Sequence, residues 1–249
     1  MENWNRRLNA DRYSNPLKAS VPDSSAGIGL RTSWNNDLTL TDLVKEVAPH
    51  ISFPKKIYGM RETVADYSMD QFIADVKAVQ AAHSDEKEIL QRVAPLAQRI
   101  ADQKDWVNDS HYRVEESQGI GITVIHEEPE ELLVETVCWS PGGGVLPHDH
   151  QTWGCVVGID GAEKNITWLR KDDGSKDGFA DLENYHEMVM RHGDICTLLP
   201  DDIHSVHNEG EVPSVSLHIY GRSLAVTDRH EFDPDAKVVR PCPKRKRND

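Results

Sequence analysis

Residues 142–154 read GGGVLPHDHQTWG, and this stretch carries the strongest indication of the fold. A glycine-rich turn leads into His148 and His150, which are separated by one residue. In a β-strand, side chains two residues apart point to the same face, so a strand here aims both imidazoles into one cavity. Pairs at this spacing also occur on strand surfaces, and the surrounding sequence therefore decides how much the pair means.

The sequence after Ser110 is typical of a β-rich domain. Short runs of apolar and β-branched residues alternate with turn residues at 141–144, 172–174 and 200–202. The predicted strands are 121–126, 132–139, 153–158, 165–170, 186–190, 194–198 and 215–220. Strands this short and numerous favour an antiparallel sandwich or barrel.

The sequence before Ser110 predicts helices instead. Apolar residues recur at helical spacing between residues 40 and 109, which indicates three or four amphipathic helices. Thr39 or Thr41 and Ser68 are the expected N-caps, and Pro95 is expected to start or kink a helix. We expect an irregular arm over 1–36 and one domain over 37–235, with a helical cover at 37–110, a barrel at 111–235 and a basic tail at 236–249.

Composition excludes several classes of protein. Asp and Glu outnumber Lys and Arg by 42 to 28, which argues against a nucleic-acid binder. With 38% hydrophobic residues and no membrane-length apolar run, the chain is expected to be cytoplasmic, without a membrane partner. Four cysteines without a paired motif predict free thiols in a reducing compartment. The basic cluster at 244–247 is expected to be a solvated tail.

A third metal ligand is expected from another strand. His204 follows the turn at 200–202, and His207 is the alternative. Three neutral imidazoles without a thiolate suit iron, copper, nickel or zinc, and they leave coordination positions open for a substrate.

Two motifs in this chain resemble those of the cupin superfamily. The first cupin motif is matched by five residues at its intervals: Gly142, His148, His150, Gly154 and Gly161. Gly154 stands where the family usually has a glutamate ligand. The second motif is matched by Gly193, Pro200, His204 and Asn208, although the proline is displaced by one position and Asp202 stands where glycine is usual. The resemblance implies a mainly β cupin barrel, also called a double-stranded β-helix or jelly roll.

Three histidines without the glutamate resemble the thiol dioxygenases, the cupin family of cysteine dioxygenase and bacterial 3-mercaptopropionate dioxygenase. The pair Cys138-Trp139 before the histidines is similar, and Trp153-Gly154 resembles the bacterial branch. Ser216, His218 and Tyr220 resemble the Ser-His-Tyr relay of that family. The resemblance implies Fe(II) at His148, His150 and His204, dioxygen and a small thiol as substrates, and Tyr220 hydrogen-bonding oxygen or substrate.

The residues expected to recognise the thiol match the family only in part. Arg229 resembles the carboxylate-binding arginine of the mercaptopropionate enzymes; a surface ion pair with Asp228 or Glu231 is its alternative role, and Arg222 could take its place. Ile122 falls where the family has Arg or Gln, which disfavours cysteine as the substrate. Mammalian cysteine dioxygenases also link a Cys to the relay Tyr, but Cys155 is expected to pack on the outer face.

Three functions compete at this point. The first is oxidation of a 3-mercaptopropionate-like thiol to its sulfinate, with cysteine oxidation as the variant. The second is a metal-binding cupin without redox chemistry, such as a sensor or storage module, and the third is another cupin enzyme, such as a nickel or zinc isomerase or a hydrolase. A polar relay at the open face of a metal favours an enzyme. The oligomeric state is left open by the sequence.

Overall fold

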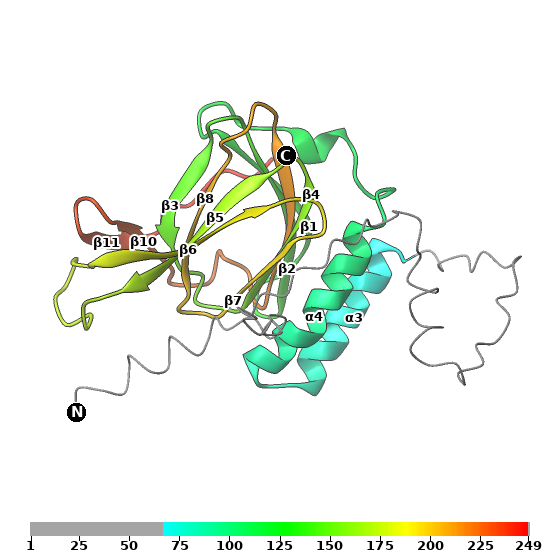
Figure 1. Ribbon diagram of the computed structural model, residues 1–249. Coiled ribbons are helices and arrows are strands. Elements are labelled where there is room, and N and C mark those ends of the chain that lie inside the picture. Colours follow the sequence, from blue (N-terminus) through cyan, green and yellow to red (C-terminus); the bar gives the residue numbers. More distant parts are fainter. Residues whose placement is uncertain (1–66, 249) are drawn as a thin grey trace, which may run out of the picture. The chain divides into compact units, whose positions relative to one another are not determined.

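A computed structural model of the protein describes residues 67–248, and two antiparallel β-sheets dominate them (Figure 1). One sheet has the order β1-β2-β9-β4-β7 and the other β11-β10-β3-β8-β5-β6. The strands are β1 (Ile120–Glu128), β2 (Leu132–Trp139), β3 (Gly144–His148), β4 (Gly154–Asp160), β5 (Glu163–Arg170), β6 (Leu182–Met190), β7 (Ile195–Leu198), β8 (Ile203–His207), β9 (Ser214–Tyr220), β10 (His230–Asp233) and β11 (Val238–Pro241). From β2 to β10 the chain crosses between the sheets after nearly every strand, so the predicted mainly β barrel is confirmed.

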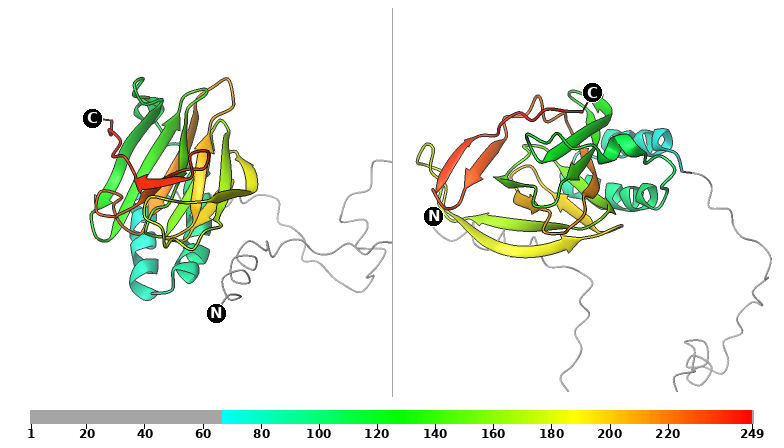
Figure 2. Two further views of the ribbon diagram at one scale, coloured as in Figure 1. Left: turned by 90° about the vertical axis from the view of Figure 1, so that its left-hand side faces the viewer. Right: turned by 90° about the horizontal axis from the view of Figure 1, so that it is seen from above.

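Two helices cover one outer face of the first sheet, as predicted (Figure 2). They are α3 (Met69–Ala82) and α4 (Glu86–Ala101), followed by the short 3-10 helix η1 (Asp109–Tyr112). Ser68 is confirmed as an N-cap, because its hydroxyl accepts a hydrogen bond from the backbone N–H of Gln71 at 3.2 Å. The helix expected near residue 40, its caps Thr39 and Thr41, and the arm at 1–36 lie outside the described residues.

The expectation that Pro95 starts a helix is wrong. Pro95 lies inside α4, where it removes one backbone donor from the helix. The helix continues through it because the buried stripe of Ile89, Val93 and Ile100 packs against the sheet. Tertiary packing here outweighs the local penalty. Among the described helices, none is both long enough and apolar enough to cross a membrane.

Strands β2 and β9, inside the helix-covered sheet, are buried at every residue, and the two faces of β9 lie in different environments. On β9, Val215, Leu217 and Ile219 belong to the core shared with the helices. The residues between them, Ser216 and His218, face the barrel interior and are buried. The alternation of a pleated strand therefore places a polar row opposite an apolar one.

The strand expected to carry both His148 and His150 ends at His148, so His150 lies in the turn after it. Four strands lie outside the predicted ranges, β3, β8, β10 and β11, although His204 on β8 was expected on a strand. They are four or five residues long, and β3 and β8 carry histidines where apolar alternation would be expected. The basic tail expected at 244–247 is exposed at Lys244, Lys246 and Arg247, but backbone hydrogen bonds hold it against the barrel. β11 pairs with β10, and the backbone N–H of Asn248 donates to the carbonyl of Ile122 at 2.7 Å, because the edge of β1 offers it an acceptor.

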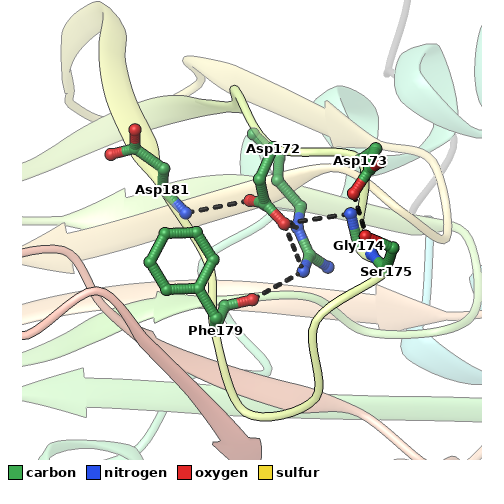
Figure 3. A network of polar contacts seen from close by, with 7 residues as sticks. Asp172, Asp173, Gly174, Ser175, Phe179 and Asp181 are labelled. Carbon is green, nitrogen blue, oxygen red and sulfur yellow. Dashed lines mark hydrogen bonds and ion pairs between the residues drawn. The ribbon is translucent and has the colours of Figure 1, made fainter.

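The predicted reversal at 172–174 joins β5 to β6 and is held by one carboxylate (Figure 3). Asp172 accepts hydrogen bonds from the Arg170 guanidinium at 2.9 Å and from the backbone N–H groups of Gly174 and Asp181, each at 2.9 Å. The hydrogen bond from Arg170 is the main reason that the pKa of Asp172 falls to about 2. The ion pair of Asp172 with Arg170 therefore closes this hairpin, and the Asp172 carboxylate is already hydrogen-bonded within it.

Candidate metal centre

Three predicted histidines converge inside the barrel. His148 ends β3 and is paired in register with His204 on β8, while His150 follows two residues after His148. The ring centroids are 4.7 Å apart for His148 and His204, 4.8 Å for His148 and His150, and 5.0 Å for His150 and His204. One ring nitrogen from each lies within 4.8 Å of the others, an arrangement that can hold one metal ion.

The alternative third ligand, His207, lies outside this group. It stands three residues beyond His204 on β8, opposite Gly144, and is only partly buried. The strand register therefore favours His204. Just after His150, Gln151 adopts a φ of 54°, a conformation that is uncommon for a residue other than glycine. Its backbone N–H donates to the carbonyl of Pro200 at 3.0 Å, which fixes the turn that presents His150.

The three imidazoles are neutral and their lone pairs are available. Burial lowers the pKa of His148 to about 4 and holds the pKa values of His150 and His204 well below 6.5. His148 Nδ1 lies 2.9 Å from the carbonyl oxygen of Leu146, which can only accept, so the proton is on Nδ1. Among the described residues, His204 Nε2 and His150 Nδ1 are buried without a hydrogen-bond partner. Buried imidazole nitrogens without a hydrogen-bond partner, in a group of three histidines, fit a metal ion.

The predicted relay is present on β9. Ser216 Oγ lies 3.0 Å from His218 Nε2, and His218 Nδ1 lies 2.8 Å from the Tyr220 hydroxyl. That hydroxyl lies 3.5 Å from His150 Nε2, so the chain of polar groups ends beside the three histidines. The glycine at position 154 makes this possible: a Cβ there would lie 3.1 Å from two ring carbons of Tyr220. Absence of the usual glutamate thus makes room for the phenol.

Two residues that the sequence analysis missed extend the relay. Glu163 and Asn165 stand two apart on β5 and are both buried. Ser216 Oγ lies 3.0 Å from Glu163 Oε2, Asn165 Nδ2 donates to Glu163 Oε1 at 3.3 Å, and Asn165 Oδ1 accepts from His204 Nδ1 at 3.1 Å. Polar groups therefore connect His204 to His150 around the barrel. In the sequence, the placement of Glu163 and Asn165 at alternate positions of a strand was the one indication that they share a face.

The charge of Glu163 decides the direction of the hydrogen bonds in the relay. Burial raises its pKa to about 7, so both charge states occur near neutral pH. An ionised Glu163 only accepts, so Ser216 donates to it, His218 donates to Ser216, and the Tyr220 hydroxyl donates to His218. A protonated Glu163 donates to Ser216 instead, every bond reverses, and the Tyr220 hydrogen is free to point at the histidines. The buried carboxyl thus controls a proton at the far end of the relay.

A cavity of about 140 Å³ opens beside the three histidines. This is far below the ~300–1,000 Å³ of pockets for drug-sized ligands, so it fits a small molecule. Its apolar wall includes Ile122, Val137 and Trp139. Ile122, which falls where the thiol dioxygenases have Arg or Gln, therefore lines the cavity with an uncharged side chain. Glu135 also lines the cavity, and burial raises its pKa to about 7.

Arg229 lines the same cavity, and the described residues give its guanidinium no ion-pair or hydrogen-bond partner. The alternative ion pair with Glu231 is not formed, because Glu231 is paired with Arg240 at 2.6 Å. Arg222 is paired with Glu130 at 2.7 Å and does not line the cavity. Of the two predicted arginines, only Arg229 lines the cavity.

The predicted position of Cys155 is confirmed. It is fully buried in the apolar core shared with the helices, and it pairs across the sheet with Ile219, whereas its neighbour Gly154 pairs with Tyr220. Cys155 and the Tyr220 side chain therefore lie on opposite faces of the sheet, and a covalent link between them is not formed.

The fold and the site together define a mainly β barrel of two antiparallel sheets with a group of three buried histidines. No protein-family model matches the chain. Three similar solved structures are an uncharacterised conserved protein with a double-stranded β-helix domain from Klebsiella pneumoniae, oxalate oxidase in complex with the substrate analogue glycolate, and KdgF from Halomonas sp.. Their identities to the chain are 16%, 15% and 17%, and their TM-scores are 0.36, 0.33 and 0.33. The matches cover 48%, 48% and 49% of this chain and 87%, 63% and 90% of the other chains. At these values none of them bears on the activity of the protein.

Proposed function

We propose that the protein is a non-haem iron(II) thiol dioxygenase that converts a small thiol carboxylate, similar to 3-mercaptopropionate, into its sulfinate. The observation that carries the proposal is the relay of Ser216, His218 and Tyr220, which ends 3.5 Å from His150. A site that only stores or senses a metal has no need for such a relay at the open side of its ligands.

Iron(II) held by His148, His150 and His204 would supply a binding position for the thiolate and the means to react it with dioxygen. The overall reaction adds both atoms of dioxygen to one sulfur, so a thiolate and O₂ give a sulfinate. Atoms and electrons balance without an external reductant.

The residues of the chain bind and orient the substrate. The apolar wall at Ile122, Val137 and Trp139 limits water around the reacting sulfur. Arg229 lines the cavity without a carboxylate partner among the described residues, and its guanidinium can bind a substrate carboxylate with two parallel hydrogen bonds. Tyr220 donates its hydroxyl hydrogen toward the reacting end of the substrate when His218 donates to it. Burial keeps the pKa of Tyr220 well above 10, so the phenol retains its proton.

The proposal is tested by oxygen uptake of iron(II)-loaded protein with 3-mercaptopropionate, cysteine, cysteamine and mercaptosuccinate, with the product identified by mass. We expect sulfinate to form in step with oxygen consumption. His204→Ala should abolish the reaction and lower the iron content. The matched control is His207→Ala, which removes a histidine from the same strand outside the metal group and should retain both.

Oxygen-dependent sulfinate formation that survives in His204→Ala would contradict the assignment of the centre. An absence of turnover with every thiol, at full iron occupancy, would contradict the dioxygenase. The protein would then be a metal-binding cupin of another function.

A further inference from the structure

The segment from Cys242 to Asn248 forms part of the wall of the metal cavity. It is held on both sides: the backbone N–H of Cys242 donates to the carbonyl of Arg229 at 2.9 Å, and Asn248 Nδ2 donates to Thr123 Oγ1 at 3.0 Å. Together with the bond from the backbone of Asn248 to Ile122, these contacts carry the segment from β10 to the edge of β1. We call residues 242–248 the C-terminal strap.

Three of the four basic residues of the strap line the cavity, and the fourth lies on the outer surface. Lys244, Arg245 and Arg247 line the cavity that holds the three histidines. Lys246 does not line it: its ammonium lies 3.9 Å from the carboxylate of Glu115, beside a different surface depression. The strap therefore offers two exposed lysines in one short segment, of which Lys244 lines the cavity and Lys246 does not.

The cations around the cavity differ in how far they are neutralised. Arg247 is paired with Glu127 at 2.7 Å, and Arg245 lies 4.0 Å from Glu231. Among the residues that the structure describes, Arg229 and Lys244 have no carboxylate partner. In a chain of net charge −14, two unpaired cations in one small cavity indicate an anionic ligand.

Glu135 does not satisfy these cations. Within residues 67–248 it is the only acidic residue that lines the cavity, and burial raises its pKa to about 7, so near neutral pH it carries only part of a charge. It also faces the nearby guanidinium groups of Arg247 and Arg229, which act against that rise in pKa. A positive excess therefore remains for a substrate.

We propose that Lys244 and Arg229 bind the two carboxylates of a thiol dicarboxylate, with the sulfur directed to the three histidines. This inference rests on the proposed function and narrows its substrate class. The backbones of Arg229 and Lys244 lie near each other. The backbone N–H of Cys242 donates a hydrogen bond to the carbonyl of Arg229, and the two residues from Cys242 to Lys244 can span at most about 7 Å. One short, branched or linear dicarboxylate can therefore reach both. Lys244 determines specificity, since a monocarboxylate needs only Arg229.

The first test measures binding without turnover. Titration calorimetry of the full-length protein with succinate and with propionate reports dicarboxylate recognition in the absence of a thiol and of oxygen chemistry. We expect succinate to bind the wild-type protein at least about tenfold more tightly than propionate, which is the scale of one charge-assisted hydrogen bond. Lys244→Gln should lose this preference, whereas Lys246→Gln removes the same charge from the same strap and should retain it.

The second test measures turnover. In the iron-loaded protein, the ratio of kcat/KM for mercaptosuccinate to that for 3-mercaptopropionate should fall about tenfold or more in Lys244→Gln and should not change in Lys246→Gln. Equal effects of the two lysine variants, or equal binding of succinate and propionate by the wild type, would overturn the inference. If no thiol is consumed but the succinate preference depends on Lys244, the dicarboxylate site stands and the dioxygenase proposal fails.

Discussion

Glu163→Gln replaces the buried carboxyl that connects the relay to the metal centre with a neutral group of the same shape. The unfolded chain loses the Glu163 proton near pH 4.5, whereas the folded protein holds it to about pH 7. Between these values the unfolded state binds fewer protons than the folded state, so the free energy of unfolding falls as pH rises. At ~1.36 kcal/mol per pKa unit, the loss is about 3 kcal/mol above pH 7.

Glutamine does not ionise, so the free energy of unfolding of the variant does not fall in this way as pH rises. We expect Glu163→Gln to be more stable than the wild type by about 3 kcal/mol at pH 8, and to show no such advantage at pH 4.5. Any cost of a weakened hydrogen bond to Ser216 applies at both pH values, and the change with pH isolates the charge. Urea unfolding of the metal-free proteins, at a series of pH values, measures the difference. Glu211→Gln, in an exposed turn, is the control for loss of one negative charge.

The same substitution tests the direction of the relay. Glutamine can donate to Ser216 at every pH, so it imitates the protonated state that frees the Tyr220 hydrogen. A decline in wild-type activity above about pH 7 should therefore be shifted or lost in Glu163→Gln. A stability difference that is constant between pH 4.5 and pH 8, or an unchanged activity profile, would refute the assignment of a raised pKa and of control over the relay.

Three further outcomes follow from the packing. Gly154→Ala places a Cβ 3.1 Å from the Tyr220 ring, so it should displace the phenol, cost ~1–3 kcal/mol in urea unfolding and lower kcat; wild-type kcat would contradict the fixed ring position. Ser68→Ala removes the N-cap of α3 and should destabilise the protein by about 1 kcal/mol in thermal unfolding, with iron content unchanged. Cys155 lies across the sheet from the Tyr220 side chain, so intact mass should show no cross-link after turnover, and a mass lower by the hydrogens lost in a thioether bond would contradict the register.

The fold was predictable where one physical signal dominated the sequence. The alternation of Ser216, His218 and Tyr220 with apolar neighbours defined both faces of β9. The spacing of His148 and His150 indicated a shared direction, although β3 ends at His148 and a turn, not a strand, presents His150. The short strands β3 and β10 gave no such signal, because a few residues paired on both sides need little apolar alternation to be held. Local patterns also could not show that packing overrides the penalty at Pro95.

The rest of the site depends on contacts between distant residues. Glu163 and Ser216 are 53 positions apart, and only the pairing of the sheets brings them within hydrogen-bond distance. The basic cluster at 244–247 has the composition of a solvated tail, and its place beside the cavity follows from backbone bonds to Ile122 and Arg229. Such neighbours are set by the tertiary fold, which a reading of local sequence does not contain.

The most direct test of the central claim is the isotopic composition of the product formed under ¹⁸O₂. Iron-loaded protein should convert a carboxylated thiol to a sulfinate that carries both oxygen atoms from dioxygen, at one O₂ consumed per thiol. A product with oxygen from water, or disulfide in place of sulfinate, would contradict the assignment of the three-histidine centre as a thiol dioxygenase.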